Sequence, residues 1–161
     1  MNPNVDIIVT QKLERTAKAL EKNNIKPYIC ETREDALSIV KSLLTKGETV
    51  STGGSVSLQE CGVIDLLKSG DYNYLDRTGL EGEALQKLYR DCFFADSYLC
   101  SSNAVTEDGF LYNVDGNSNR VSAITFGPRQ VIMVVGMNKI VRNIDEAAKR
   151  VKSIAAPANT K

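Results

Sequence analysis

The chain has 161 residues, 42% hydrophobic and 25% charged, which is typical of one globular domain long enough to bury a core. Its 20 Lys and Arg residues balance its 20 Asp and Glu residues and are scattered along the chain, which excludes the basic surface of a nucleic-acid-binding protein. There is no histidine, so a Ser-His-Asp triad and histidine metal ligands are excluded. Any proton transfer falls to Glu, Asp, Lys, Tyr, Cys or water.

The cysteines and the apolar segments indicate where in the cell the protein is expected. Cys30, Cys61, Cys92 and Cys100 form no C-x-x-C pair, which argues against a zinc site or an iron–sulfur cluster built within this chain. The longest apolar runs, such as 131–135, are too short to span a bilayer, and the N-terminus lacks a signal pattern. We therefore expect a cytoplasmic protein with no membrane partner and with no metal or cofactor in this chain.

Hydrophobic periodicity predicts alternating helices and strands in the first half of the chain. Thr32 and Asp35 have the spacing of a capping box, with Asp in place of the usual Glu. In chain order we expect a helix over 6–24, a strand over 28–30, a helix from the Thr32 cap to Gly47, a strand over 48–52, a helix that ends at Gly70 and a strand over 72–75.

The second half of the chain continues the pattern and adds a hairpin. Asp108-Gly109 is typical of a hairpin turn with positive φ, and V-I-M-V-V predicts a strand buried on both faces. In order we expect a loop over 77–82, a helix over 83–94, strands over 97–106 and 110–114, a polar segment over 116–120, a short apolar element over 121–126, a strand over 130–135 and a helix over 145–154.

Repeated strand–helix units predict an α/β fold with an open, mainly parallel sheet, flanking helices and a β-hairpin. We expect residues 1–154 to form a single domain and residues 155–161 to be a tail.

A glycine-rich turn between a predicted strand and a predicted helix is the first candidate site. The stretch V-S-T-G-G-S-V-S-L-Q-E-C-G covers residues 50–62. Backbone N–H groups at the carboxyl end of a strand favour a phosphate or carboxylate. The alternative is a tight turn in which Ser57 and Glu60 form a capping box. Walker A and dinucleotide patterns are both missing, and spacing alone leaves both interpretations open. The candidate ligand contacts are Thr52, Gly53, Gly54 and Ser55.

The second candidate site is the polar segment from residue 103 to residue 120. Glu107 and Asp108 are adjacent carboxylates that could act as general acid, base or nucleophile. The alternative, which the residues alone favour, is a solvated Asp-Gly turn followed by an Asn- and Gly-rich loop. If the segment is a site, its asparagine side chains would orient a substrate and Arg120 would hold an anionic group. The candidate ligand contacts here are Asn103, Asn113, Asp115, Asn119 and Arg120.

Three blocks of the sequence resemble a known family. They are V-S-T-G-G-S-V-S-L-Q-E-C-G-V-I-D-L-L, then A-D-S-Y-L-C-S-S-N-A-V-T-E-D-G-F-L-Y-N-V-D-G-N-S-N-R-V-S-A-I-T-F-G-P, then V-I-M-V-V-G-M-N-K-I-V. In this order they are similar to successive blocks of the LUD-domain family, the lactate utilization protein C group. The resemblance implies a fold of the NagB/RpiA/CoA-transferase type, an open α/β sheet with ligand loops at the carboxyl ends of its strands.

The resemblance also implies a role in oxidising L-lactate to pyruvate with iron–sulfur partner subunits, whose clusters would carry the electrons. This chain would then be a non-redox subunit or accessory protein. In the superfamily the glycine-rich turn commonly meets a phosphate or CoA group, so a hydroxy acid, a phosphate or a CoA ester is the expected ligand. The turn has no lysine of its own, and the balancing charge should come from Arg120 or another distant cation.

Two alternatives accompany this interpretation. The segment Thr106-Glu107-Asp108-Gly109 is similar to one that carries a glutamate nucleophile in some CoA transferases, which would make the chain a stand-alone enzyme of acyl-CoA or sugar-phosphate chemistry. The other alternative is a non-catalytic interaction module. Related chains often continue past the position of Lys161 into a cysteine-bearing tail, so the tail here is expected to be short or truncated.

Overall fold

The computed structural model describes residues 3–159 and divides the chain into two compact units. The first, here the sheet unit, contains Glu31–Ser101 and Asp115–Val134. The second, here the hairpin unit, contains the described parts of Met1–Cys30, Ser102–Val114 and Val135–Lys161. No helix within these described residues is long and apolar enough to cross a membrane.

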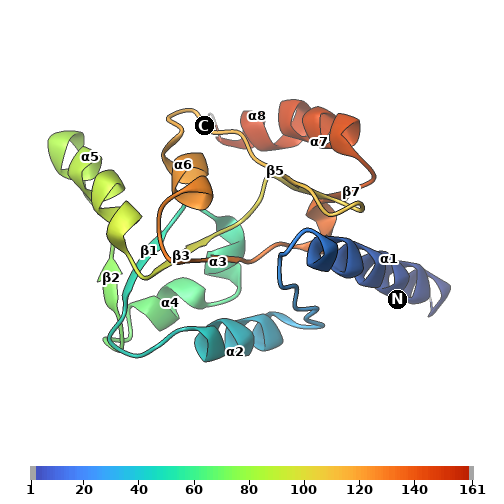
Figure 1. Cartoon of the computed structure of the whole chain (residues 1–161), viewed down its shortest axis with the longest axis horizontal. Helices are drawn as coiled ribbons and strands as arrows, with labels where there is room; N and C mark the ends of the chain where they lie inside the picture. The colour runs from blue at the N-terminus through green and yellow to red at the C-terminus, as the bar shows by residue number, and fades with distance from the viewer. Residues whose placement is uncertain (1–2, 160–161) are drawn as a thin grey trace. The chain divides into compact units, whose positions relative to one another are not determined.

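A four-stranded parallel sheet forms the centre of the sheet unit (Figure 1). The strand order is β2-β1-β3-β6, and every neighbouring pair is parallel. The carboxyl ends of all four strands therefore lie at one edge, and the predicted α/β fold with a mainly parallel sheet is confirmed. The strands are β1 (Thr49–Thr52), β2 (Asn73–Leu75), β3 (Ser97–Cys100) and β6 (Gln130–Met133).

Helices of the sheet unit cover both faces of this sheet. In Figure 1, α2, α3 and α4 lie on one side of the strands, and α5 and α6 lie on the other. Their bounds are α2 (Arg33–Leu43), α3 (Val56–Glu60), α4 (Val63–Leu67), α5 (Gly82–Asp91), the 3-10 turn η1 (Cys92–Phe94) and α6 (Asn119–Thr125).

Alternate side chains of the strands enter two separate apolar clusters, because successive residues of a strand point to opposite faces. Val50 and Leu99 belong to the cluster that includes residues of α2, α3 and α4. Tyr98 and Cys100 belong to the other cluster, which includes Ala123 of α6. All four residues of β3 are buried, as expected for a central strand between two helical layers.

The capping box predicted at the start of α2 is confirmed. The Thr32 hydroxyl accepts the Asp35 N–H at 3.0 Å, and the Asp35 carboxylate accepts the Thr32 N–H at 3.0 Å. The helix ends at Leu43, before the predicted stop at Gly47, whose φ of 83° places it in a left-handed turn.

The predicted helix after the glycine-rich turn is two short helices, α3 and α4. They are separated at Gly62, which has a φ of 71°, a conformation that an L-residue in a continuous helix cannot adopt. The predicted Ser57–Glu60 capping box is wrong. The N-cap is Ser55, whose hydroxyl accepts the Leu58 N–H at 3.4 Å.

The hairpin unit has a three-stranded sheet of order β5-β4-β7. The predicted turn over residues 107–109 is confirmed: the Gly109 N–H donates to the Thr106 carbonyl at 2.9 Å, and Gly109 has a φ of 87°. The elements are α1 (Pro3–Lys22), β4 (Ala104–Thr106), β5 (Leu111–Tyr112), η2 (Met137–Lys139), β7 (Ile140–Val141), α7 (Ile144–Arg150), the π-helical turn η3 (Val151–Ala155) and α8 (Ala156–Asn159).

Three strand predictions need correction. Residues 28–30 are not a strand; Tyr28 is 41% and Ile29 47% exposed, and the segment pairs with no strand of the described chain. The predicted strand 97–106 is two strands, because residues 101–103 leave the parallel sheet and β4 joins the other one. β6 is an edge strand with one buried residue, Ile132, so it is not buried on both faces.

The C-terminal segment that was expected to be a tail continues in helical conformation as far as Asn159. Residues 160 and 161 lie outside the described part of the chain.

Candidate functional site

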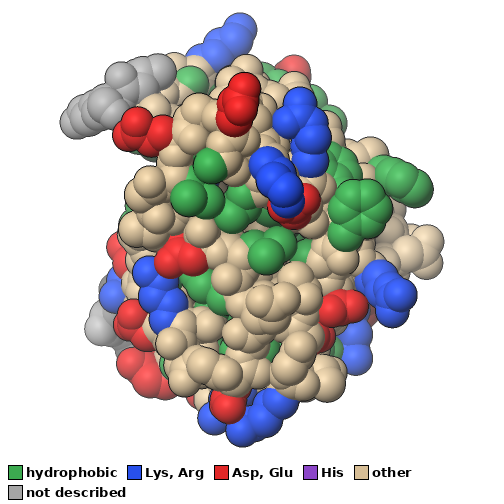
Figure 2. Space-filling view, turned by 90° about the vertical axis from the view of Figure 1, so that its left-hand side faces the viewer, with side chains coloured by type: hydrophobic (Ala, Val, Ile, Leu, Met, Phe, Trp, Pro, Cys, Tyr) green, Lys and Arg blue, Asp and Glu red, His purple; other side chains and the backbone are tan. Residues whose placement is uncertain are grey.

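A cavity of about 380 Å³ lies at the carboxyl ends of β1 and β2 in the sheet unit. Its walls come from the residues that follow each strand and from α5. Figure 2 views the molecule from the side on which α5 lies in Figure 1, and hydrophobic side chains are exposed there among charged ones. The lining includes Thr52, Gly53, Gly54 and Ser55 after β1, Asp76, Arg77 and Thr78 after β2, and Leu85 and Tyr89 of α5.

The glycine-rich turn offers fewer free donors than the sequence indicates. The Gly53 N–H donates to the Leu99 carbonyl at 2.9 Å, so it continues the sheet and does not face a ligand. The Ser55 hydroxyl caps α3, a helix of only five residues. The Gly54 N–H makes no hydrogen bond to residues 3–159, and it is therefore a donor that the turn leaves for a ligand.

The two glycines of the turn are needed for different reasons. A Cβ at Gly53 would lie 3.0 Å from both the Arg120 Cδ and the Tyr98 Oη. A Cβ at Gly54 would lie 2.5 Å from the Arg77 Nη2. Gly53 therefore makes room for buried packing beneath the turn, and Gly54 makes room for a guanidinium that lines the cavity.

Arg77 brings a cation into the cavity. It follows β2, and its guanidinium makes no hydrogen bond or ion pair with the described residues 3–159. Asp76 does not neutralise it, because the Asp76 carboxylate accepts the Thr78 hydroxyl at 2.7 Å and pairs with Lys68 at 3.0 Å. These partners, the Thr78 hydroxyl first, lower the pKa of Asp76 to about 2. Arg77 therefore remains available to an anion.

Two hydroxyl side chains that line the cavity, Thr52 and Tyr74, contact each other. The hydroxyls of Thr52 and Tyr74 lie 3.0 Å apart, and either can be the donor. Tyr98, beneath Gly53, is 2% exposed, and burial raises the pKa of its hydroxyl. The Tyr98 hydroxyl is therefore neutral at physiological pH.

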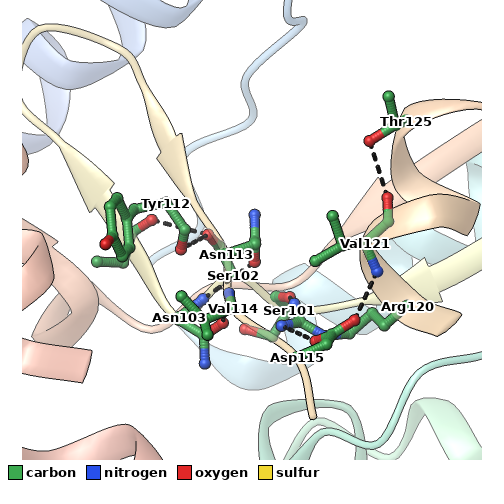
Figure 3. A network of polar contacts seen from close by, with 11 residues as sticks. Ser101, Ser102, Asn103, Tyr112, Asn113, Val114, Asp115, Arg120, Val121 and Thr125 are labelled. Atoms are coloured by element: carbon green, nitrogen blue, oxygen red, sulfur yellow. Dashed lines mark hydrogen bonds and ion pairs between the residues drawn. The ribbon is translucent and has the colours of Figure 1, made fainter. Parts of the chain in front are cut away.

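The aliphatic part of the Arg120 side chain packs beside Gly53, whereas its guanidinium pairs with Asp115. The Asp115 Oδ1 lies 2.6 Å from the Arg120 Nη2 and 2.9 Å from its Nε, and the Ser101 carbonyl accepts from Nη1 at 3.0 Å (Figure 3). The two side chains are only 13% and 9% exposed. Asp115 also accepts the Val121 N–H at 2.6 Å, so this pair joins the start of α6 to the end of β3.

The remaining candidates of the second polar segment divide between the two units. Asn119 is the first residue of α6 in the sheet unit. Asn103 and Asn113 belong to the hairpin unit and brace the base of the hairpin (Figure 3): the Asn113 Oδ1 accepts the Asn103 N–H at 3.3 Å, and the Asn103 Oδ1 accepts the Val114 N–H at 2.9 Å.

Glu107 and Asp108 occupy the hairpin turn. The Glu107 carboxylate pairs with Arg15 at 3.3 Å and with Lys12 at 3.8 Å, both on α1. Asp108 is exposed, and its carbonyl accepts from the Asn23 amide at 3.4 Å. In the hairpin unit these contacts connect the turn to α1.

Sequence reasoning missed Arg77 and the wall from α5. One signal for Arg77 was present, because it comes two residues after a predicted strand. If β2 is placed parallel and next to β1, residues that follow the two strands must meet at the same edge. The sequence does not specify that pairing, since the register Val50 to Tyr74 joins segments on either side of two helices.

The four cysteines form no disulfide within the described residues. Cys92 and Cys100 are buried, and Cys30 and Cys61 are half-buried. The Cys92 Sγ lies 2.7 Å from the Ser51 Oγ, and burial raises the pKa of this thiol. Within the described residues, no three His, Cys, Asp or Glu side chains are placed to hold a metal ion.

A cavity at the carboxyl edge of a parallel α/β sheet is where ligand-binding proteins of this class place their sites. The chain belongs to the LUD-domain family, because the family model described as LUD domain matches residues 13–161. LUD domains are associated with lactate utilisation proteins, and the fold agrees with the NagB/RpiA/CoA-transferase type. Neither a curated protein nor a solved structure matches the chain.

Proposed function

We propose that the protein is a non-redox subunit or accessory protein of lactate utilisation, which binds a small anionic metabolite beside the Gly53-Gly54 turn. In this proposal it acts with iron–sulfur partner subunits in the oxidation of L-lactate to pyruvate. Membership of the LUD-domain family supports the metabolic setting. The reactant and the product are both carboxylates at neutral pH, so a site for an organic anion suits the role.

The observation that carries the proposal is the position of the Arg77 guanidinium. It lies over Gly54 in the cavity, without a counter-ion among the described residues. A guanidinium presents paired N–H donors that match the two oxygens of a carboxylate. The Gly54 N–H lies beside it and would donate to the same anion, while the Thr52 and Tyr74 hydroxyls would bind a polar substituent.

The contacts of Glu107 support a structural part for this residue. Its carboxylate is held by two cations of α1, and a nucleophile would have to leave both of them. The proposal therefore assigns binding and orientation to Arg77, Gly54 and the two hydroxyls, and it assigns no covalent step to this chain.

The anion site is tested by calorimetric titration and thermal shift with L-lactate, pyruvate, inorganic phosphate and larger 2-hydroxy acids. Arg77→Gln should weaken binding of the responding anion roughly 10- to 100-fold, because a hydrogen bond to a charged group contributes about 1.5–3 kcal/mol. Arg90→Gln is the matched control, since Arg90 is an exposed arginine of α5 bonded to its own helix at Gln86. Equal affinities in the two variants would refute the anion site.

The non-redox role has a separate test. The purified chain alone should not reduce an added electron acceptor with L-lactate, whereas mixing it with iron–sulfur proteins encoded by neighbouring genes should give activity. Lactate oxidation by the isolated chain would contradict the role.

A further inference from the structure

The cavity beside Arg77 is larger than a three-carbon acid requires. Lactate and pyruvate have six heavy atoms each, and at about 30 Å³ per water-sized group they fill at most roughly 180 Å³. The cavity is about 380 Å³. Binding sites usually bury most of their ligand's surface, so a ligand that matches this cavity is about twice as large.

Part of the lining of the cavity is apolar. Leu80, Leu85, Tyr89 and Ile64 contribute to its lining. Leu80 lies in the loop after β2, Leu85 and Tyr89 belong to α5, and Ile64 belongs to α4. All four side chains are only half-buried. Covering these side chains with a hydrocarbon removes apolar surface from water, which is favourable.

The incomplete burial of α5 also supports an apolar ligand. This ten-residue helix has no fully buried residue, although its apolar side chains recur at helical spacing. Leu88 packs against the cluster of Cys92 and Tyr98, whereas Leu85 and Tyr89 face the cavity. The protein therefore covers only part of the apolar face of α5.

From a lining that combines an arginine with apolar side chains we infer that the ligand is an organic acid with an apolar body longer than that of lactate. Its carboxylate binds Arg77 and the Gly54 N–H, and its alkyl or aryl body lies against Leu85, Tyr89 and their neighbours. This inference rests on the proposed anion site and specifies its ligand class.

A homologous series tests the inference. Affinities of the full-length protein are measured by calorimetry for straight-chain L-2-hydroxy acids of three to eight carbons and for phenyllactate. Each added methylene should tighten binding about fourfold until the cavity is filled, as expected for burial of a methylene group. Leu85→Asn should reduce this gain to below about twofold, and Leu85→Met should retain it because the side chain stays apolar and of similar volume. Circular dichroism checks that both variants fold, and Leu80→Asn repeats the test from the loop.

The outcomes separate the two proposals. A gain with chain length that disappears in Leu85→Asn, together with weaker binding in Arg77→Gln, supports both. Arg77-dependent binding that is equal for all chain lengths overturns the apolar-body inference and leaves the anion site standing. If no acid shows Arg77-dependent binding, both proposals are overturned.

Discussion

Two adjacent charged residues after β2, Asp76 and Arg77, differ in whether their charge is paired. Asp76 is paired with Lys68 and accepts two hydrogen bonds from Thr78, whereas Arg77 has no counter-ion among the residues that the structure describes. Because the carboxylate is satisfied by its own loop, it does not cancel the positive charge of the cavity. The pair therefore keeps the loop in place while the arginine remains free for an anion.

The Asp76 contacts predict a pH-dependent contribution to stability. Its pKa is lowered from the ordinary value of 3.8 to about 2 in the folded chain, so the contribution is complete above pH 4 and is lost as the pH falls toward 2. Asp76→Asn should lower the free energy of unfolding at pH 7 by about 1 kcal/mol, a value reduced for solvent screening. Urea denaturation of both proteins between pH 2 and 7 should show the difference shrinking toward zero at the acidic end; a constant difference would argue against the ion pair.

The two glycines of the turn predict different results for the same substitution. Gly54→Ala meets only the mobile end of the Arg77 side chain, so its thermal midpoint should stay close to that of the wild type while anion affinity falls. Gly53→Ala meets the buried Tyr98 hydroxyl and the Arg120 stem, and it should lower stability by about 1–2 kcal/mol. Thermal denaturation and calorimetric titration of both variants distinguish these effects. An equal loss of stability in both would contradict the described packing.

At the scale of the element, short helices depend on their caps. The reciprocal Thr32–Asp35 bonds satisfy two backbone N–H groups at the start of α2, and Ser55 does the same for one N–H at the start of α3. These caps fix where the helices begin, and the cap of α3 thereby places Gly54 at the cavity.

Removal of the α2 cap gives an element-scale prediction. Thr32→Ala should lower the free energy of unfolding by about 1 kcal/mol. Ser38→Ala in the same helix is the control, because its exposed hydroxyl bonds only the Glu34 carbonyl one turn earlier and alanine has the higher helix propensity. Denaturant midpoints should therefore fall for Thr32→Ala and stay level or rise for Ser38→Ala; the reverse order would exclude a stabilising cap.

At the scale of the whole molecule, the position of the apolar core determines which part of the chain is most stable. Both apolar clusters found in the described part of the chain belong to the sheet unit. Leu99, at the centre of β3, is completely buried in one of them. We therefore expect the parallel sheet to carry most of the stability, with its amides exchanging only on global unfolding.

Truncation of this core tests the expectation. Leu99→Ala should destabilise the protein by about 2–5 kcal/mol, because it removes buried methyl groups and leaves a cavity. Val56→Ala, at a side chain that is 67% exposed, should change stability by no more than about 0.5 kcal/mol. Hydrogen exchange should show the slowest amides in β1 and β3. Faster exchange in β3 than in the β4–β5 hairpin would contradict this picture.

The sequence by itself determined the features that depend on near neighbours. The Thr32–Asp35 capping box, the Asp108-Gly109 turn and the strand before Gly53-Gly54 are encoded within a few residues each, and the structure has all three. Repeated strand–helix units were enough to predict a mainly parallel sheet.

Only the tertiary structure decided which distant residues meet. It divided residues 97–106 between two sheets, engaged the Arg120 guanidinium with Asp115 and brought Arg77 over Gly54. These contacts depend on the pairing of β1 with β2 and β3, and hydrophobic periodicity does not specify the partners of a strand. The cation of the candidate site therefore became visible only after the strands were placed side by side.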